Sequence, residues 1–170
     1  MWHKKYQFNF PTTIRFGANI VAELSEFLEQ QNVKKPLIVT DSILSKLPII
    51  KGLSKILDQG DFSYFIFDDV SKNPVESDVT KGVKAYHKNQ CDSIIGIGGG
   101  ASIDVARAIV LMANHPGNLF DYEDGTGGDK NVIDANIPYF IAIPTTSGTG
   151  SEVGRSSIIS DEKTHQKRII

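Results

Sequence analysis

The sequence has few of the features that mark exported or membrane proteins. Cys91 is the single cysteine, so no internal disulfide bond can form, which is typical of a protein in a reducing cytoplasm. No apolar run approaches the roughly 20 residues that a membrane-spanning helix requires. The first residues contain no apolar signal core. We therefore expect a cytoplasmic protein with no membrane as a partner.

An excess of charge of one sign is also lacking. The 170 residues include 18 Lys and Arg against 20 Asp and Glu, and the basic residues form no block. Proteins that bind nucleic acid concentrate basic residues in patches, so nucleic acid is not expected as a partner. The four histidines show no metal-ligand spacing, and no G-x-S-x-G nucleophile motif occurs. The sequence therefore assigns no catalytic residue and no metal ligand within these residues.

What the chain does contain is an alternation of apolar runs and segments of helical periodicity. The pattern predicts buried strands at residues 37–40, 63–67, 93–97 and 139–143, and helices at 20–31, 43–59, 75–86 and 102–112. It also predicts two short strands at 6–10 and 12–16, or one strand broken by Pro11, and a further strand at 155–160. A turn at 160–163 with a return strand from 169, and a long loop at 115–135 that contains one short helix, complete the pattern. Such alternation implies parallel βαβ units. The expected fold class is α/β, with a Rossmann-like parallel sheet covered by helices on both faces.

Three consecutive glycines, Gly98, Gly99 and Gly100, separate the apolar run 93–97 from the helical segment 102–112. Glycine lets the backbone approach a phosphate closely, and the free N–H groups at the start of a helix point toward the anion. Residues 96–101 also fit the dinucleotide fingerprint G-x-G-x-x-A. A turn of this composition also joins strands to helices without binding any ligand. We call residues 98–100 the glycine turn.

Two further polar clusters follow predicted strands. Asp41 comes directly after the run 37–40, where its carboxylate can accept hydrogen bonds from a ribose and would repel a 2′-phosphate. Its alternative role is that of a helix N-cap. Residues 145–150 offer four hydroxyls and two glycines, which suits contact with a ribose or a pyrophosphate, although a plain polar loop has the same composition. Because ligands bind at the carboxyl ends of parallel strands, we expect all three clusters to line one crevice.

Two of these stretches resemble the hallmark motifs of the iron-containing (group III) alcohol dehydrogenases. Residues 98–109, GGGASIDVARAI, resemble the family motif GGGSxxDxAKAI, and residues 144–153, PTTSGTGSEV, closely match the second motif. The dipeptide Asn73-Pro74 supports the resemblance, and the matches occur in family order. Ala101 and Arg107 depart from the serine and lysine that the family usually carries.

The resemblance implies that residues 1–170 form the N-terminal NAD(P)-binding domain, similar to that of dehydroquinate synthase, without the all-helical C-terminal domain. The implied activity of the full-length parent is the NAD(P)-dependent interconversion of a small alcohol and an aldehyde or ketone by hydride transfer. The divalent metal, Fe or Zn, would be bound only in that parent, so we expect the 170 residues alone to be inactive. A homodimer formed through N-terminal strands is also implied.

The resemblance further implies which residues bind the nicotinamide dinucleotide. Asp41 would hold the adenosine ribose, which favours NAD over NADP. The pyrophosphate and nicotinamide-ribose path would run past Asn73, the glycine turn and Asp104. The threonines would contact the adenine and ribose side. The full set comprises Asp41, Asn73, Gly98, Gly99, Gly100, Ala101, Asp104, Thr145, Thr146, Thr149, Ile158 and Lys167.

Two other functions are compatible with the sequence alone. One is an enzyme related to dehydroquinate synthase or glycerol dehydrogenase, which share the architecture, although the threonine-rich run argues against it. The other is a stand-alone nucleotide-binding module without catalysis. Nothing in the sequence indicates the substrate.

Overall fold

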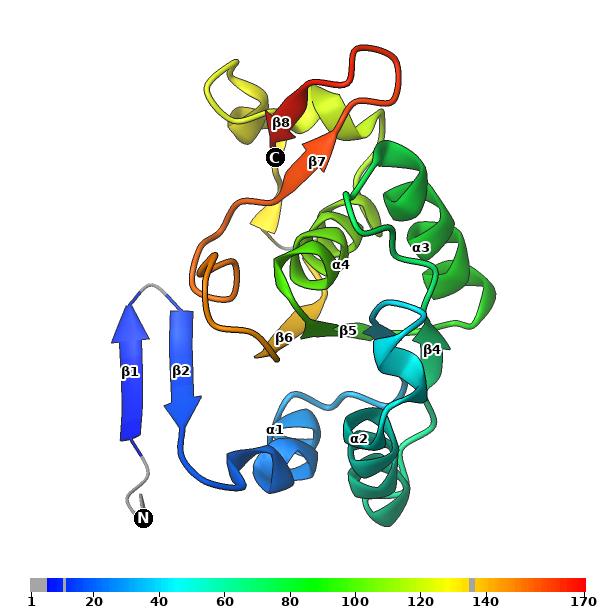
Figure 1. The fold of residues 1–170 in the computed structure, drawn as a ribbon, viewed down its shortest axis with the longest axis vertical. Helices are drawn as coiled ribbons and strands as arrows, with labels where there is room; N and C mark the ends of the chain where they lie inside the picture. The colour runs from blue at the N-terminus through cyan, green and yellow to red at the C-terminus, as the bar shows by residue number, and fades with distance from the viewer. Residues whose placement is uncertain (1–5, 11, 135–136) are drawn as a thin grey trace.

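A four-stranded parallel sheet forms the centre of the protein, which is described by a computed structural model over residues 6–10, 12–134 and 137–170 (Figure 1). The order of the strands across the sheet is β4-β3-β5-β6. Their bounds are β3 Pro36–Val39, β4 Phe65–Phe67, β5 Ser93–Gly98 and β6 Tyr139–Pro144. All three pairings are parallel, as the strand–helix alternation of the sequence predicts.

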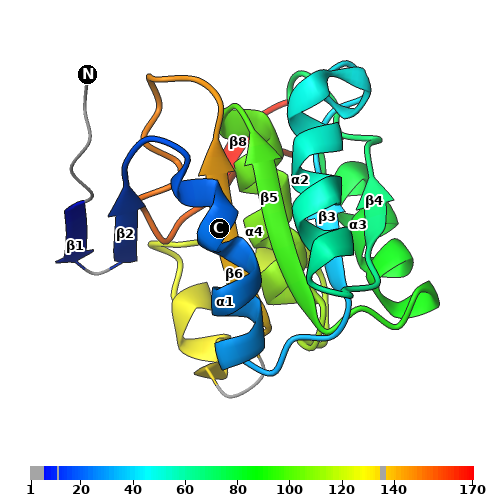
Figure 2. The ribbon, with the colours of Figure 1, turned by 90° about the horizontal axis from the view of Figure 1, so that it is seen from below.

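Helices cover both faces of this sheet (Figures 1 and 2). On one face lie α1 (Leu24–Gln30), which follows a 3₁₀ turn at Ile20–Glu23, and α2 (Pro48–Gln59). On the other face lie α3 (Glu76–Lys88) and α4 (Gly100–Met112). The predicted fold class, an α/β Rossmann-like sheet with helices on both faces, is confirmed.

Two hydrophobic cores follow from the alternation of side chains along the buried strands. Leu37 and Val39 of β3 pack with α3 and α4, whereas Ile38, between them, packs with α1 and α2. Every residue of β3 and β5 is buried, which is why these strands appear in the sequence as continuous apolar runs.

Two antiparallel hairpins stand outside the sheet. One consists of β1 (Tyr6–Phe10) and β2 (Thr12–Phe16), as predicted, with residue 11 between them outside the described residues. The other consists of β7 (Ile158–Ser160) and β8 (Lys167–Ile169). Its first strand begins three residues later than predicted, because Arg155 lies in a bend and Ser156 in irregular backbone. Ser157 still exchanges two backbone hydrogen bonds with Ile170, at 2.8 and 2.9 Å.

The prolines explain two differences from the predicted elements. Pro48 begins α2 instead of disturbing a longer helix, since the first position of a helix needs no N–H donor. A 3₁₀ turn at Leu44–Lys46 precedes it. Pro144 is the last residue of β6, although the predicted strand stopped at residue 143. Because β6 is an edge strand and the next N–H, that of Thr145, faces β5, the proline nitrogen faces away from β5 and no hydrogen bond of the sheet is lost. The loop at 115–135 contains two 3₁₀ turns, Leu119–Tyr122 and Gly128–Asn131, where the sequence predicted one helix.

Candidate functional site

The candidate site lies at the carboxyl ends of the central strands β3 and β5. From β3 the chain continues into α2 on one face of the sheet, and from β5 into α4 on the other. Val39 is paired with Gly96, so the two strand ends are neighbours. In doubly wound sheets, a ligand crevice forms at such a switch point, where the connections diverge.

The glycine turn occupies the end of β5 and the first turn of α4. Gly98 has a φ of 148°, a value that favours glycine, and a Cβ atom there would lie 2.7 Å from Ser102 Oγ. Gly99 is the N-cap of α4, and no side chain caps the helix. The first N–H groups of α4 therefore have no acceptor within the helix. Together with the helix dipole, they suit an anion such as a pyrophosphate.

The hydroxyl-rich loop, residues 145–150, lies directly against this turn. Its first residue is tied to β5, because the Thr145 N–H donates to the Gly98 carbonyl at 2.9 Å. A Cβ atom at Gly100 would lie 2.8 Å from Thr149 Oγ1. A Cβ atom at Gly99 would lie 3.4 Å from Thr146 Oγ1. A side chain at Gly100 would therefore displace the Thr149 hydroxyl, whereas one at Gly99 would meet the Thr146 hydroxyl only at an ordinary contact distance.

Asp41 follows β3 and serves as a turn cap. Its Oδ1 accepts the N–H groups of Ile43 and Leu44, each at 2.9 Å. Its Oδ2 has no hydrogen-bond partner in the described part of the chain. Since the side chain is half-buried, this second oxygen remains open to a further donor. Asp41 thus caps the turn that follows β3 and is not the N-cap of a helix, since neither the 3₁₀ turn at Leu44–Lys46 nor α2 has a side-chain cap. The bonds use one carboxylate oxygen and leave the other for a further donor.

Asp104 and Arg107 form the polar side of α4 and are largely buried. Asp104 is 8 % exposed, and burial raises the pKa of its carboxyl group. Hydrogen bonds from the Ile158 N–H and the Ser151 hydroxyl, and the charge of Arg107, act in the opposite direction. Burial likewise lowers the pKa of the Arg107 guanidinium, whereas Asp104 raises it. Asp104 thus connects the start of α4 to Ile158, another predicted site residue.

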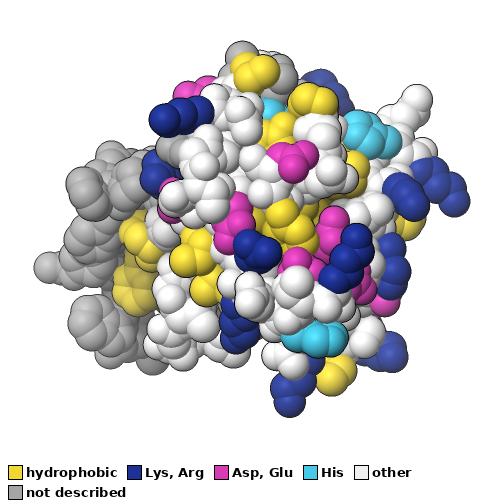
Figure 3. Space-filling view, turned by 90° about the horizontal axis from the view of Figure 1, so that it is seen from above, with side chains coloured by type: hydrophobic (Ala, Val, Ile, Leu, Met, Phe, Trp, Pro, Cys, Tyr) yellow, Lys and Arg dark blue, Asp and Glu magenta, His cyan; other side chains and the backbone are white. Residues whose placement is uncertain are grey.

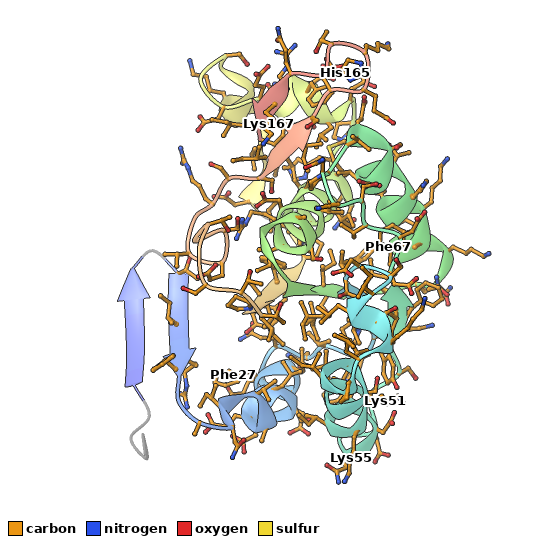
Figure 4. All side chains as sticks on the ribbon, in the orientation of Figure 1. Phe27, Lys51, Lys55, Phe67, His165 and Lys167 are labelled. Carbon is orange, nitrogen blue, oxygen red and sulfur yellow. The ribbon has the colours of Figure 1, made fainter. Side chains whose placement is uncertain are left out.

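Asn73 and Lys167 belong to a second group around the β7–β8 hairpin. The Ser160 N–H donates to the Pro74 carbonyl at 2.8 Å, next to Asn73, and Ser160 is paired with Lys167 in the hairpin. At the tip, Glu162 accepts both the N–H and the hydroxyl of Ser77 at the start of α3. The hairpin is therefore clamped to the loop that follows β4. Figure 4 shows Lys167 on the α3–α4 side of the sheet, opposite Lys51 and Lys55 of α2.

The structure thus brings most of the predicted site residues to one edge of the sheet. Those that lie in or directly against the glycine turn and α4 are Gly98, Gly99, Gly100, Ala101, Asp104, Thr145, Thr146, Thr149 and Ile158. Asp41 lies at the end of the neighbouring strand. Within the described residues, no hydrogen bond or ion pair joins Asp41, Asn73 or Lys167 to the glycine turn.

Three residues of this region carry contacts that the sequence did not reveal. Arg107 was visible only as a departure from a motif, and Ser151 only as one hydroxyl in a polar run. Glu162 gave no signal, because its partner Ser77 lies 85 positions away. Contacts of this range depend on how the elements pack and not on local sequence.

The acidic, histidine and cysteine side chains are dispersed over the protein. Among the residues that the structure describes, no group of three or more of them is arranged to hold a metal ion. No helix in the same part of the chain is long and apolar enough to cross a bilayer. On the face drawn in Figure 3, acidic and basic side chains are interspersed, without a broad patch of either sign.

Comparisons with known proteins agree with this geometry. A family model described as iron-containing alcohol dehydrogenase matches residues 11–170. Choline dehydrogenase of Bacillus subtilis is 34% identical over 160 residues, which are 94% of this chain and 39% of that protein. A crystal structure of 1,3-propanediol oxidoreductase superposes with a TM-score of 0.83 at 29% identity, covering 100% of this chain and 42% of that one.

A second solved structure contains a bound nucleotide. It is the sulfoacetaldehyde reductase from Bifidobacterium kashiwanohense in complex with NAD⁺, with a TM-score of 0.80 and 29% identity over 100% of this chain and 43% of that one. The chain thus spans about two fifths of the length of the relatives that it matches.

Proposed function

The chain belongs to the iron-containing alcohol dehydrogenase family, and from that premise we propose that its 170 residues are the NAD-binding domain of an alcohol dehydrogenase. The complete enzyme would interconvert a small alcohol and an aldehyde or ketone by hydride transfer. The dinucleotide supplies the hydride chemistry, and this chain binds and orients it. No catalytic residue is assigned to the chain, and the 170 residues alone would be inactive.

One observation carries the proposal: Asp41, the glycine turn and the hydroxyl-rich loop follow the carboxyl ends of the neighbouring strands β3, β5 and β6. The unpaired N–H groups of α4 offer donors for a pyrophosphate, and the missing Cβ atoms allow close approach. The loop hydroxyls offer further donors to phosphate or ribose. The residues therefore offer the hydrogen-bond donors that a pyrophosphate needs and a carboxylate for a ribose.

Asp41 would determine the choice between NAD and NADP. Its Oδ2 is free to accept a ribose hydroxyl, while its charge would repel a 2′-phosphate at the same position. The oxygen used for capping is the other one, so both tasks are compatible. We therefore propose NAD as the preferred cofactor.

The described residues do not offer a ligand set for a metal ion. We propose that the divalent metal of the parent enzyme, Fe or Zn, takes its ligands from a further, helical domain. The named activities of the relatives involve choline, 1,3-propanediol and sulfoacetaldehyde, which differ widely in charge. Substrate choice would then also lie with the remainder of the enzyme.

We further propose a cytoplasmic homodimer. The single, buried Cys91 suits a reducing compartment. The β1–β2 hairpin stands apart from the sheet and has strand edges that a second copy could pair with (Figure 1). Analytical ultracentrifugation at two protein concentrations tests this, and a monomer at both would refute it.

Calorimetric titration with NADH and with NADPH tests the cofactor proposal. We expect the chain to bind NADH more tightly than NADPH. In Asp41→Asn the amide oxygen still caps the turn but the charge is gone, so NADH affinity should fall about tenfold while NADPH affinity does not fall. The matched control is Asp58→Asn, the same change at an exposed position of α2. Equal affinity of the parent chain for both nucleotides, or an unchanged preference in Asp41→Asn, would refute the role of Asp41.

A further inference from the structure

The segment between the hydroxyl-rich loop and β7, residues 151–157, forms only turns, bends and irregular backbone. It runs beside α4 (Figure 1). Two of its backbone carbonyls accept hydrogen bonds from a side chain of α4. Arg107 Nη1 donates to the Ser156 carbonyl at 2.9 Å, and Nη2 donates to the Ser151 carbonyl at 2.5 Å. The guanidinium also lies 5.5 Å from the centroid of the Phe140 ring of β6.

Asp104, one helical turn before Arg107, accepts hydrogen bonds from the same stretch of chain. Its carboxylate accepts the Ser151 hydroxyl and the N–H of Ile158, the first residue of β7. Asp104 and Arg107 are 4.0 Å apart at positions i and i+3. One face of α4 therefore holds residues 151–157 through two side chains, with the Asp104 carboxylate as acceptor and the Arg107 guanidinium as a donor of two hydrogen bonds.

Thr149 connects Ser151 to the glycine turn. The Thr149 hydroxyl lies 3.0 Å from the Ser151 hydroxyl and accepts the Ser151 N–H at 3.3 Å. The same Thr149 Oγ1 is the atom that a Cβ at Gly100 would meet at 2.8 Å. A continuous path of contacts thus leads from Arg107 to the loop hydroxyl beside the start of α4.

We propose that Arg107 is a positioning residue for cofactor binding, which holds the Ser151 and Ser156 carbonyls so that the loop hydroxyls stay against the glycine turn. The inference rests on the proposed function, because it assumes that the loop contacts a nicotinamide dinucleotide. Arg107 itself does not touch the ligand. It acts through the loop, whose residues 145–149 are all exposed and need an anchor.

The chemistry of the side chain explains why an arginine suits this position. A guanidinium carries two Nη groups in a fixed fork and can reach two carbonyls at once, whereas an ammonium is a compact point donor. The family motif has a lysine here. Arg107→Lys should therefore restore part of the function that a variant without donors loses, and it serves as the conservative variant.

The test is calorimetric NADH binding by the parent chain, Arg107→Met and Arg107→Lys. The methionine variant retains length and packing against Phe140 but has no N–H donor. We expect its NADH affinity to fall about tenfold or more, a free-energy loss of about 1.4 kcal/mol for each factor of ten. The lysine variant should lose clearly less. Arg155→Met is the matched control, because it makes the same substitution within the segment 151–157 itself, at an exposed arginine that has no hydrogen bond to the described residues.

Amide hydrogen exchange supplies the readout that a general loss of stability would not produce. In Arg107→Met, the amides of residues 145–157 should exchange faster, whereas those of β3 and α2 should be unchanged. If these amides exchange faster and NADH still binds within twofold of the parent chain, the inference is overturned. If the methionine variant does not fold, the same two measurements on Arg107→Lys test the inference. Faster exchange of the amides of residues 145–157 with NADH affinity within twofold of the parent chain would overturn it. A parent chain that is folded but binds no NADH would instead refute the proposed function.

Discussion

Gly96 of β5 lies where α4 crosses the sheet, and we predict that replacing it with alanine destabilises the chain. A Cβ atom at this position would lie 2.7 Å from the Cβ of Ala106 and 3.4 Å from Cε2 of Phe140. Carbon atoms in contact prefer about 3.5–4.0 Å. Because the Cβ of Ala106 is fixed to the helix backbone, no rotamer change relieves the clash. The helix itself would have to move by about 1 Å.

The size of the effect follows from two opposing contributions. Forcing an extra methyl group into a packed core costs about 1–3 kcal/mol. Replacing glycine by alanine also restricts the unfolded chain, which returns about 0.4–1 kcal/mol. The expected net loss of unfolding free energy for Gly96→Ala is thus about 1–2 kcal/mol. With a urea m value of about 2 kcal/mol/M, the midpoint should fall by about 0.5–1 M.

Urea unfolding followed by circular dichroism measures this midpoint, and α2 offers a matched control. A Cβ atom at Gly52, an exposed position in α2, meets nothing within 4 Å. Gly52→Ala should therefore raise the unfolding free energy by about 0.5–1 kcal/mol through better helix propensity. The same chemical change then has opposite signs at two sites. If Gly96→Ala raised the midpoint as Gly52→Ala does, with unchanged m values, the close packing of α4 on β5 would be refuted.

Three further predictions concern single groups. Gly98→Ala should lower the unfolding free energy by about 1–2 kcal/mol, because φ is 148° and the new Cβ meets Ser102; an unchanged urea midpoint would contradict this. Burial raises the pKa of the Cys91 thiol to about 11, so at pH 8 iodoacetamide should modify the native chain far more slowly than the urea-unfolded one; equal rates would show an accessible thiolate. The pKa of Asp161 is lowered, chiefly by the Thr164 N–H, so its stabilisation is present above the unfolded pKa and is lost as the pH falls through the folded value. Asp161→Asn should therefore flatten the decline of the urea midpoint below about pH 4, and identical pH profiles would argue against it.

Local sequence was sufficient for the central sheet because its strands are buried on both faces. Short, mostly apolar runs rich in β-branched residues, such as residues 37–40 and 93–97, are typical of strands buried on both faces. The glycine turn was recognisable for the same reason, since it directly joins such a strand to a helix. The motif resemblance added the family. In contrast, the first strand of the β7–β8 hairpin was predicted from residue 155 and begins at Ile158. The contacts that hold the hairpin to α3 and α4 come from residues far away in sequence and were not predicted.

Asp41 shows why a residue pattern can leave two interpretations open. Position alone allowed a helix N-cap or a ribose ligand, and the structure uses one carboxylate oxygen to cap a turn instead of a helix. The alternatives were not exclusive, because a carboxylate has two oxygens and the cap needs only one. A pattern of residue types states which chemistry is available at a position but not how many of its atoms are already engaged.

The glycine turn and the hydroxyl-rich loop beside it differ in how firmly they are held. The glycine turn begins at the buried end of β5 and continues into α4, so it moves only if the core moves. Residues 145–149 of the loop are exposed, and in the described part of the chain few hydrogen bonds hold the loop, chiefly at Gly98 and at Ser151. Segments of this kind open at the lowest free-energy cost. Substitutions that loosen the loop should therefore weaken nucleotide binding well before they lower the global unfolding free energy. Substitutions under the glycine turn, such as Gly96→Ala, should affect both together.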